Sequence, residues 1–254
     1  MKRILTKILC TGLVLVCASL AVVGQDRALR IGFQTSPFVS WIGNNDNLIV
    51  KNGSNIGIKL GSTVDIYFKD NYSFTTGINL AFHAGGEFQY EIGGNYLPNS
   101  DLSEPFLGDK PMPDGTKIRY SLQYVEIPLG LKIRSKEIGY VRYFVEAPVF
   151  NFAFLTRGRA NIETNIKKYD QENIYKDLNV VNLFWGFGVG IEYSISENNA
   201  LVGGLYYQNG LLDFTKDDGH RAIPNPEVNP PFLIQQDDSR AVVNNLVLRL
   251  GIIF

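Results

Sequence analysis

Two histidines, His83 and His220, are the side chains in this sequence best suited to acid–base chemistry. A hydrolase would pair one of them with a serine nucleophile, and Ser73 or Ser121 would have to be the partner of His83. Ser73 lies ten residues from His83, about 33 Å along one extended strand at ~3.3 Å per residue, which is too far for proton transfer. Ser121 falls on the adjacent predicted strand, but nothing marks it as a nucleophile. We therefore expect His83 to be a polar residue in the lumen or at its rim, and His220 to be solvated.

Oxygen ligands for a metal ion are clustered at two acidic pairs, Asp217-Asp218 and Asp237-Asp238. Calcium takes carboxylate and carbonyl oxygens, but the spacing of these pairs matches no calcium-binding loop. Neither histidine has a neighbour at metal-ligand spacing, and no glycine-rich phosphate loop joins a strand to a helix. The sequence therefore predicts no metal, no cofactor and no enzymatic activity.

A third set of chemically active residues consists of charges on the polar positions of otherwise alternating segments. The interior of a small β-barrel is just wide enough to be filled by its own side chains, so charges there must be paired. Basic and acidic residues are balanced in this set, which predicts a closed lumen crossed by salt bridges. Two interpretations remain open: the pairs hold the barrel together, or they gate a narrow ion path. The set is Lys59, Asp65, Glu126, Lys132, Glu192 and Arg249.

Segments with apolar residues at every second position are the elements that must position these charges. Successive side chains of a strand point to opposite faces, so each segment has one apolar and one polar face. In residues 56–68, isoleucines and leucines alternate with glycine, lysine, threonine and aspartate. The pattern predicts eight strands, at residues 29–33, 56–68, 74–82, 125–133, 140–157, 183–193, 201–207 and 246–254.

The fifth of these segments, residues 140–157, changes its apolar parity part-way along. Val145 and Val149 share one parity, whereas Phe150 and Phe152 follow on the other. An extra residue in one strand of a ladder produces such a change, and proline is tolerated at such sites. We therefore expect a β-bulge near Pro148.

Short and long connections alternate along the chain without exception. The short ones are at residues 69–71, 135–139 and 196–199, and the long ones at 42–54, 85–118, 158–179 and 215–240. Outer-membrane barrels have short periplasmic turns and long external loops, and an even number of strands places both ends of the barrel in the periplasm. We therefore predict an all-β fold, a transmembrane antiparallel up-and-down β-barrel of eight strands in the outer membrane.

The N-terminus has the pattern of a secretory signal. Three basic residues precede an uncharged apolar run at residues 8–23, and cleavage after Gly24 leaves a small residue at the site. Both cysteines, Cys10 and Cys17, lie in this segment, and Val16 is too large for a lipid-attachment signal. We expect a signal peptide at residues 1–24 and a cysteine-free barrel domain at residues 25–254.

The composition excludes other classes of protein. Without residues 1–24 the chain has 21 basic and 25 acidic residues, which argues against binding nucleic acid. No later apolar run reaches the ~18 residues that a membrane helix needs. Aromatic residues gather near the predicted strand ends, where we expect them to form belts at the lipid headgroups. They are Tyr67, Phe68, Tyr72, Tyr140 and Tyr193 near the short turns, and Trp41, Tyr120, Trp185 and Phe214 near the long connections.

A soluble β-sandwich or a lipocalin-like barrel is the main alternative fold, because its strands also alternate. Four long connections at one end would be unusual in those folds. The polar positions are also rich in glycine and in charges of both signs, which suits a crowded lumen better than an aqueous surface. These observations favour the membrane barrel.

Two stretches resemble known outer-membrane families. The last strand resembles the C-terminal assembly signal of bacterial outer-membrane barrels, which implies recognition by the barrel-insertion machinery. Residues 124–132 resemble the Y-L-E-I-P-L-L-L-K stretch of the PorT-like β-barrels of Bacteroidetes, and residues 207–212 are similar to a late strand of that family. The resemblance covers most of residues 27–254 except the long connections, and Ala147 replaces a usual glycine. The signal residues are Leu246, Leu248, Leu250, Ile252 and Phe254.

The expected function is non-enzymatic: a structural or interaction component of the cell envelope that contacts membrane lipid and another envelope protein. The resemblance to PorT-like barrels also implies an accessory role in protein secretion. The proline-rich stretches 224–226 and 230–232 would suit an interaction surface, because proline stiffens the chain. A narrow porin or ion channel is the alternative, and an envelope hydrolase using His83 is a third possibility.

Overall fold

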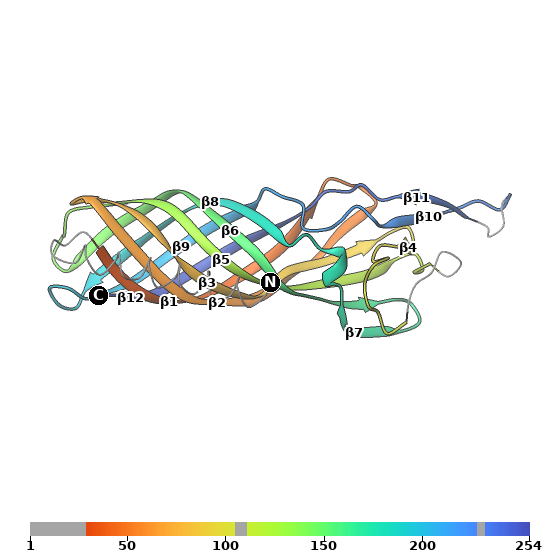
Figure 1. Ribbon diagram of the computed structural model, residues 1–254, viewed down its shortest axis with the longest axis horizontal. Coiled ribbons are helices and arrows are strands. Elements are labelled where there is room, and N and C mark those ends of the chain that lie inside the picture. Colours follow the sequence, from red (N-terminus) through yellow and green to blue (C-terminus); the bar gives the residue numbers. More distant parts are fainter. Residues whose placement is uncertain (1–28, 105–110, 228–231) are drawn as a thin grey trace, which may run out of the picture.

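Long antiparallel strands close into a barrel, each paired with its neighbours along the chain (Figure 1). The computed structural model describes residues 29–104, 111–227 and 232–254. The predicted signal peptide and Pro230 and Pro231 lie outside these residues. The barrel strands are β1 (Leu29–Asn44), β2 (Ile49–Lys69), β3 (Tyr72–Tyr90), β5 (Thr116–Arg134), β6 (Val141–Glu163), β8 (Val181–Ser194), β9 (Ala200–Gly210) and β12 (Ala241–Ile253).

The ring closes through the pairing of β1 with β12, which joins distant parts of the sequence and sets Gly32 opposite Ile253. The consecutive strands β5 and β6 pair on another side of the ring. β1 begins and β12 ends at the end of the barrel that carries the short turns, since Leu29 lies opposite Ile66. The predicted eight-stranded antiparallel barrel is confirmed. No helix among the described residues is long and apolar enough to cross a membrane.

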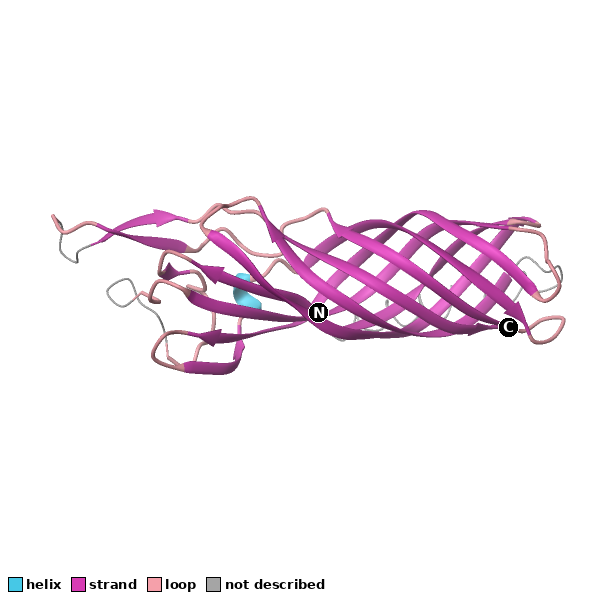
Figure 2. Cartoon of the chain, turned by 180° about the vertical axis from the view of Figure 1, so that it is seen from behind, coloured by secondary structure: helices cyan, strands magenta, loops and turns pink. Residues whose placement is uncertain are grey.

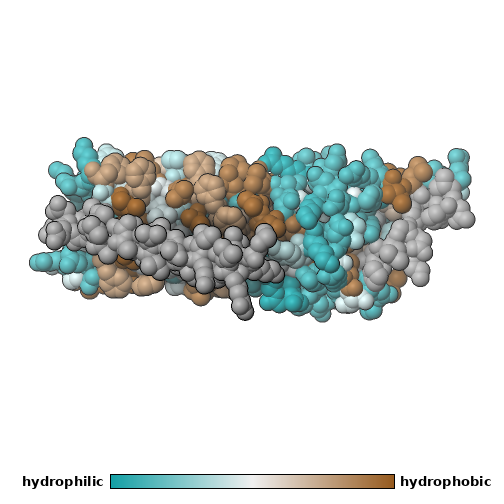
Figure 3. All heavy atoms as spheres, in the orientation of Figure 1, coloured by the Kyte–Doolittle hydropathy of each residue, from teal (hydrophilic) through white to brown (hydrophobic). Residues whose placement is uncertain are grey.

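The barrel wall separates two kinds of side chain, as the alternating sequence predicts. Figure 3 shows an apolar surface over the half of the molecule that carries the short turns, and a hydrophilic surface beyond it. Apolar side chains point outward from every strand of this short-turn half, where no other described residue covers them. Examples, one per strand, are Phe33, Leu60, Phe74, Leu129, Phe152, Phe187, Leu205 and Leu248.

The strands continue well past this apolar belt, so the long connections are largely not loops. β3 runs to Tyr90 and β6 to Glu163, and the expected connection 42–54 reduces to residues 45–48. Among the described residues, four short strands and one 3-10 helix add to these ends (Figure 2). We call the described residues within 43–54, 84–122, 157–180 and 211–242 the extension. Its added elements are β4 (Gly94–Asn95), β7 (Lys168–Asn173), η1 (Tyr175–Asp177), β10 (His220–Pro224) and β11 (Phe232–Gln236).

The extension has a hydrophobic core where the membrane half has a polar lumen. In β3 a bulge between Ala81 and Ala84 shifts the register by one residue, so even-numbered residues turn from the outer to the inner face. Phe74, before the bulge, is 57% exposed, whereas Phe88, after it, is 1% exposed. The sequence pattern missed the β3 part of this core because the same parity faces outward in one half of the strand and inward in the other.

Two of the expected belt aromatics belong to this core instead. The Tyr120 and Phe214 rings are buried and meet edge to face, with their centroids 5.4 Å apart. Their placement at a lipid interface was wrong, because they lie on inward-facing positions of the extension. Trp185, by contrast, faces outward.

The predicted bulge near Pro148 is confirmed. The pairing of β6 with β8 shifts register between Glu146 and Val149, and the Ala147–Pro148 peptide bond is cis. Val149 is only 3% exposed, so its assignment to the outward apolar face was wrong. The bulge turns Val149 inward and leaves Phe150 facing outward.

Glycines on the inner face of β8 leave room for large side chains from the neighbouring strand β9. A Cβ atom at Gly188 would lie 2.1 Å from the Tyr206 ring, a distance that only glycine avoids. The glycines on the inward-facing positions therefore let side chains pack closely inside the barrel, and they do not line an open channel.

We expect Phe88→Ala to destabilise the extension by about 3–5 kcal/mol, since it removes a fully buried ring. The matched substitution Phe74→Ala, on the same strand but facing outward, should leave the extension unchanged. Hydrogen–deuterium exchange resolved by segment measures both effects. Equal exchange in the two variants would contradict a hydrophobic core in the extension.

Candidate functional site

A buried cluster of charges occupies the lumen near the short-turn end. The Lys132 ammonium lies 2.8 Å from the Asp65 carboxylate and 2.5 Å from that of Glu192. Glu192 also accepts hydrogen bonds from Arg30 and Arg134, at 3.2 and 3.3 Å. Every one of these ions therefore has an opposite charge in contact, as burial requires.

A second ion pair lies deeper in the lumen. Arg249 donates to both carboxylate oxygens of Glu146, at 2.9 and 3.1 Å. Its guanidinium also lies 3.9 Å from the centroid of the Tyr206 ring, which is a cation–π contact. Tyr206 is the ring that packs on Gly188, so the pair, the ring and the glycine fill one level of the barrel.

A third ion pair lies between this level and the extension. The Lys59 ammonium is 2.8 Å from both oxygens of Glu126 and 2.8 Å from the side-chain oxygen of Gln208. Lys59 and Glu126 are both buried. Gln34 and Asn79 add a neighbouring hydrogen bond of 2.6 Å between their side chains.

The structure thus divides the six predicted lumen residues into separate groups. It brings Asp65, Lys132 and Glu192 together, joins Lys59 to Glu126, and pairs Arg249 with a residue outside the predicted set. Sequence reasoning missed Glu146, Arg30 and Arg134. Glu146 lies on the inner parity before the β6 bulge, so the parity change in residues 140–157 was the signal that identifies it.

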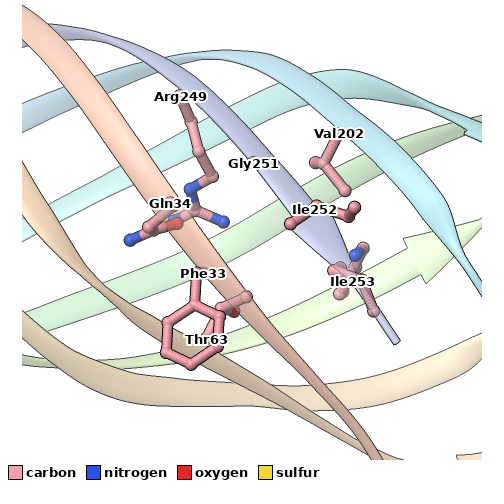
Figure 4. A pocket seen from close by; sticks show the side chains of 9 residues that line it. Phe33, Gln34, Thr63, Val202, Arg249, Gly251, Ile252 and Ile253 are labelled. Atoms are coloured by element: carbon pink, nitrogen blue, oxygen red, sulfur yellow. The ribbon is translucent and has the colours of Figure 1, made fainter.

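A small pocket lies among the same residues, between β1, β2, β9 and β12 (Figure 4). Arg249 and Gln34 lie close together on one side of the pocket, and Thr63 and Val202 line other parts of its wall. Its charged lining residues, Arg249 and Lys132, already belong to the ion pairs described above. We therefore treat the pocket as part of the lumen packing.

The two histidines do not lie where the sequence placed them. His83 is at the β3 bulge with its side chain exposed, and its Nδ1 is 3.0 Å from the Ile56 carbonyl oxygen. It therefore does not line the lumen. His220 is a half-buried residue of β10, opposite Gln236 and Asn95, rather than a solvated loop residue.

The acidic pairs of the last long connection bind protein groups. The Asp237 carboxylate lies 2.5 Å from Arg221, and Asp218 accepts a 2.9 Å hydrogen bond from the Asn99 amide. Among the described residues, no group of three or more His, Cys, Asp or Glu side chains is arranged to hold a metal ion.

Arg221 fastens the β10–β11 hairpin to the rest of the extension. It is 8% exposed and bridges Asp237 to Asp46, which lies in the β1–β2 turn. Partial burial raises the pKa of Asp46, but the Leu48 N–H and the Arg221 guanidinium lower it more, so the pKa lies below its usual value. The docked hairpin therefore stabilises the ionised form of Asp46.

Comparison with known families decides the class of this barrel. Residues 24–216 match the family described as outer membrane protein beta-barrel domain. The chain belongs to this family. It is accordingly a protein of the outer membrane, with its apolar belt in the lipid and its short turns on the periplasmic side. No curated protein matches the chain.

Solved structures of other outer-membrane barrels align along most of the chain at low identity. Neisserial surface protein A has 10% identity and a TM-score of 0.42, with 89% of this chain and 96% of that chain covered. Ail of Yersinia pestis has 12% identity and a TM-score of 0.35, with 88% and 98% covered. The outer membrane protease OmpT of Escherichia coli has 10% identity and a TM-score of 0.39, with 91% and 97% covered.

We expect Lys132→Met to destabilise the barrel by about 3–5 kcal/mol, because it leaves Asp65 and Glu192 buried with one cation fewer. Lys136→Met, the same change at an exposed position, should shift stability by no more than about 0.5 kcal/mol. Urea unfolding in detergent, followed by tryptophan fluorescence, measures the difference. Similar midpoints for the two variants would show that the lumen pair is not required.

We expect the β10–β11 hairpin to loosen in acid. A carboxyl group with a lowered folded-state pKa contributes stability above its ordinary pKa of about 3.9, and this is lost as the pH falls through the folded value. Hydrogen exchange of the hairpin, corrected for intrinsic rates, should therefore rise below about pH 4. Asp46→Asn should weaken docking at neutral pH and flatten this dependence. An unchanged pH profile in Asp46→Asn would refute the role of Asp46.

Proposed function

We propose that this protein is a non-enzymatic interaction component of the outer membrane, with a lumen closed to ions and an extension that contacts another protein outside the cell. The observation that carries the proposal is the filled interior. Three levels of buried ion pairs occupy the membrane half, and a hydrophobic core follows in the extension. A hydrated ion would have to break each pair in turn.

The core of the extension adds a second barrier in series with the ion pairs. Tyr120, Leu122 and Phe88 are fully buried on the inner faces of β3 and β5. These side chains fill the interior beyond the polar lumen. An opening in the lumen would therefore lead into apolar side chains. Both barriers support a structural role for the lumen, which favours a function at the outer surface.

The last strand supports recognition by the barrel-insertion machinery. Leu246, Leu248 and Leu250 face outward along β12, and the Phe254 side chain is exposed at its end. An accessory role in secretion rests on the resemblance of residues 124–132 to PorT-like barrels. That role stays a prediction.

A narrow channel is the second candidate function. The favourable observation is that the lumen carries ionised groups along the membrane half, where a purely structural interior would need none. Conduction would require Lys59 and Glu126 to separate, since the ion pair that they form lies across the lumen.

Planar-bilayer recording distinguishes these two functions. We expect the purified protein to give no sustained openings in salt solution, under conditions in which a porin control conducts. Sustained, ion-selective openings would overturn the closed lumen and favour the channel.

A further inference from the structure

Three strands of the extension, β4, β7 and β11, lie at the edges of its sheets, and β4 is covered there by a bridge from Gly94 to Met112. β7 pairs with β6 and β11 pairs with β10; along the described residues β7 has one further bridge, from Asn173 to Asp101. β7 carries Lys168, Asp170 and Glu172, whereas β11 carries no charge. Proteins protect open edges with charges or proline, because unpaired N–H and C=O groups bind other strands. β7 is protected in this way and β11 is not.

The ladder shows which backbone groups of β11 face the open edge. The Ala222 N–H donates to the Gly93 carbonyl, so Ala222 faces away from β11, and Ile234 lies opposite it. The Asp237 N–H, just after β11, donates to the Gly219 carbonyl, just before β10. Odd-numbered residues on the β11 side therefore bond towards β10. Since alternate residues of an antiparallel strand face opposite edges, Leu233 and Gln235 bond to β10. The N–H and C=O of Ile234, with those of the residues two before and two after it, therefore point outward.

The same strand exposes apolar side chains on both of its faces. Ile234 is 61% exposed and Leu233 is 49% exposed. The hairpin extends along the long axis of the molecule beyond the rest of the extension (Figures 1 and 2), and Figure 3 shows apolar residues at that end. Proteins seldom leave an uncharged apolar edge in water unless it binds a partner.

We propose that the open edge of β11 binds an extended, uncharged segment of a partner protein, which adds as a fourth strand to the sheet formed by β11, β10 and β4. This inference rests on the interaction role proposed above and names its mode. Backbone hydrogen bonds to Ile234 and its alternate neighbours would give affinity, and the apolar faces would select apolar side chains. The absence of charge in β11 matches an uncharged partner strand.

The geometry argues against a second copy as the occupant. Two copies in one membrane point the same way, so their β11 strands would run parallel about a two-fold axis along the membrane normal. Such an axis places identical residues at the same height, with N–H opposite N–H. A parallel ladder needs facing residues offset by one position. The partner strand therefore comes from a different protein.

A peptide-binding experiment tests this mode with the full chain in detergent. The probe is a fluorescent eight-residue peptide of alternating threonine and valine, and its binding is measured by fluorescence anisotropy. Controls are the same peptide N-methylated on one edge and one with lysine in place of each threonine. We expect the unmodified probe to bind and both controls to bind at least about tenfold more weakly.

The matched variants are Ile234→Pro and Ile234→Thr. Proline removes one outward N–H without removing a bond to β10, and edge strands tolerate it in this position. We expect Ile234→Pro to weaken probe binding at least about tenfold, while Ile234→Thr, which keeps the N–H, stays within about threefold. Heat-modifiable migration on a denaturing gel verifies that both variants fold.

Failure to bind the probe, or equal binding to Ile234→Pro and the unaltered protein, would overturn the inference. Cross-linked dimers that form in the unaltered protein and disappear in Ile234→Pro would assign the edge to a second copy and overturn it as well. Either result together with silent bilayers would leave the proposed closed barrel standing. Probe binding by a conducting barrel would instead refute the proposed function alone.

Discussion

The rest of the structure depends on the need to pair charge inside a narrow barrel surrounded by lipid. An unpaired ion in such a place is very costly, so each cation must reach a carboxylate on another strand. Lys132 meets carboxylates from β2 and β8, and Arg249 crosses to β6. These contacts fix which residues share a level, and therefore reinforce the register that the hydrophobic pattern sets.

The same strands serve two solvents along their length. In lipid the outer face is apolar and the inner face polar, whereas in water the extension reverses this arrangement. The reversal takes different forms in different strands. In β3 a bulge at His83 exchanges the inward-facing and outward-facing positions. In β5 the even-numbered residues face inward throughout and change from apolar or aromatic ones, such as Tyr120, to charged ones, such as Glu126 and Lys132.

These differences explain what the sequence predicts and what it does not. Regular alternation identified all eight barrel strands, because in lipid one parity is uniformly apolar. The outer part of β3 was taken for a loop, because its buried apolar residues share parity with the lipid-facing ones and a short bulge separates the two sets. The lumen residues were predicted from parity, but their partners depend on strand stagger across the ring. Arg30 was missed for this reason, since no local pattern shows which level of the barrel its side chain reaches. Glu146 could have been found from the parity change in residues 140–157, but its pairing with Arg249 could not.

The seam between the first and last strands carries cations on both sides. Arg30 belongs to β1 and Arg249 to β12, while their carboxylate partners lie on β8 and β6. Pairing of β1 with β12 holds both arginines beside these carboxylates. Closure of the cylinder therefore also completes the set of counterions in its interior.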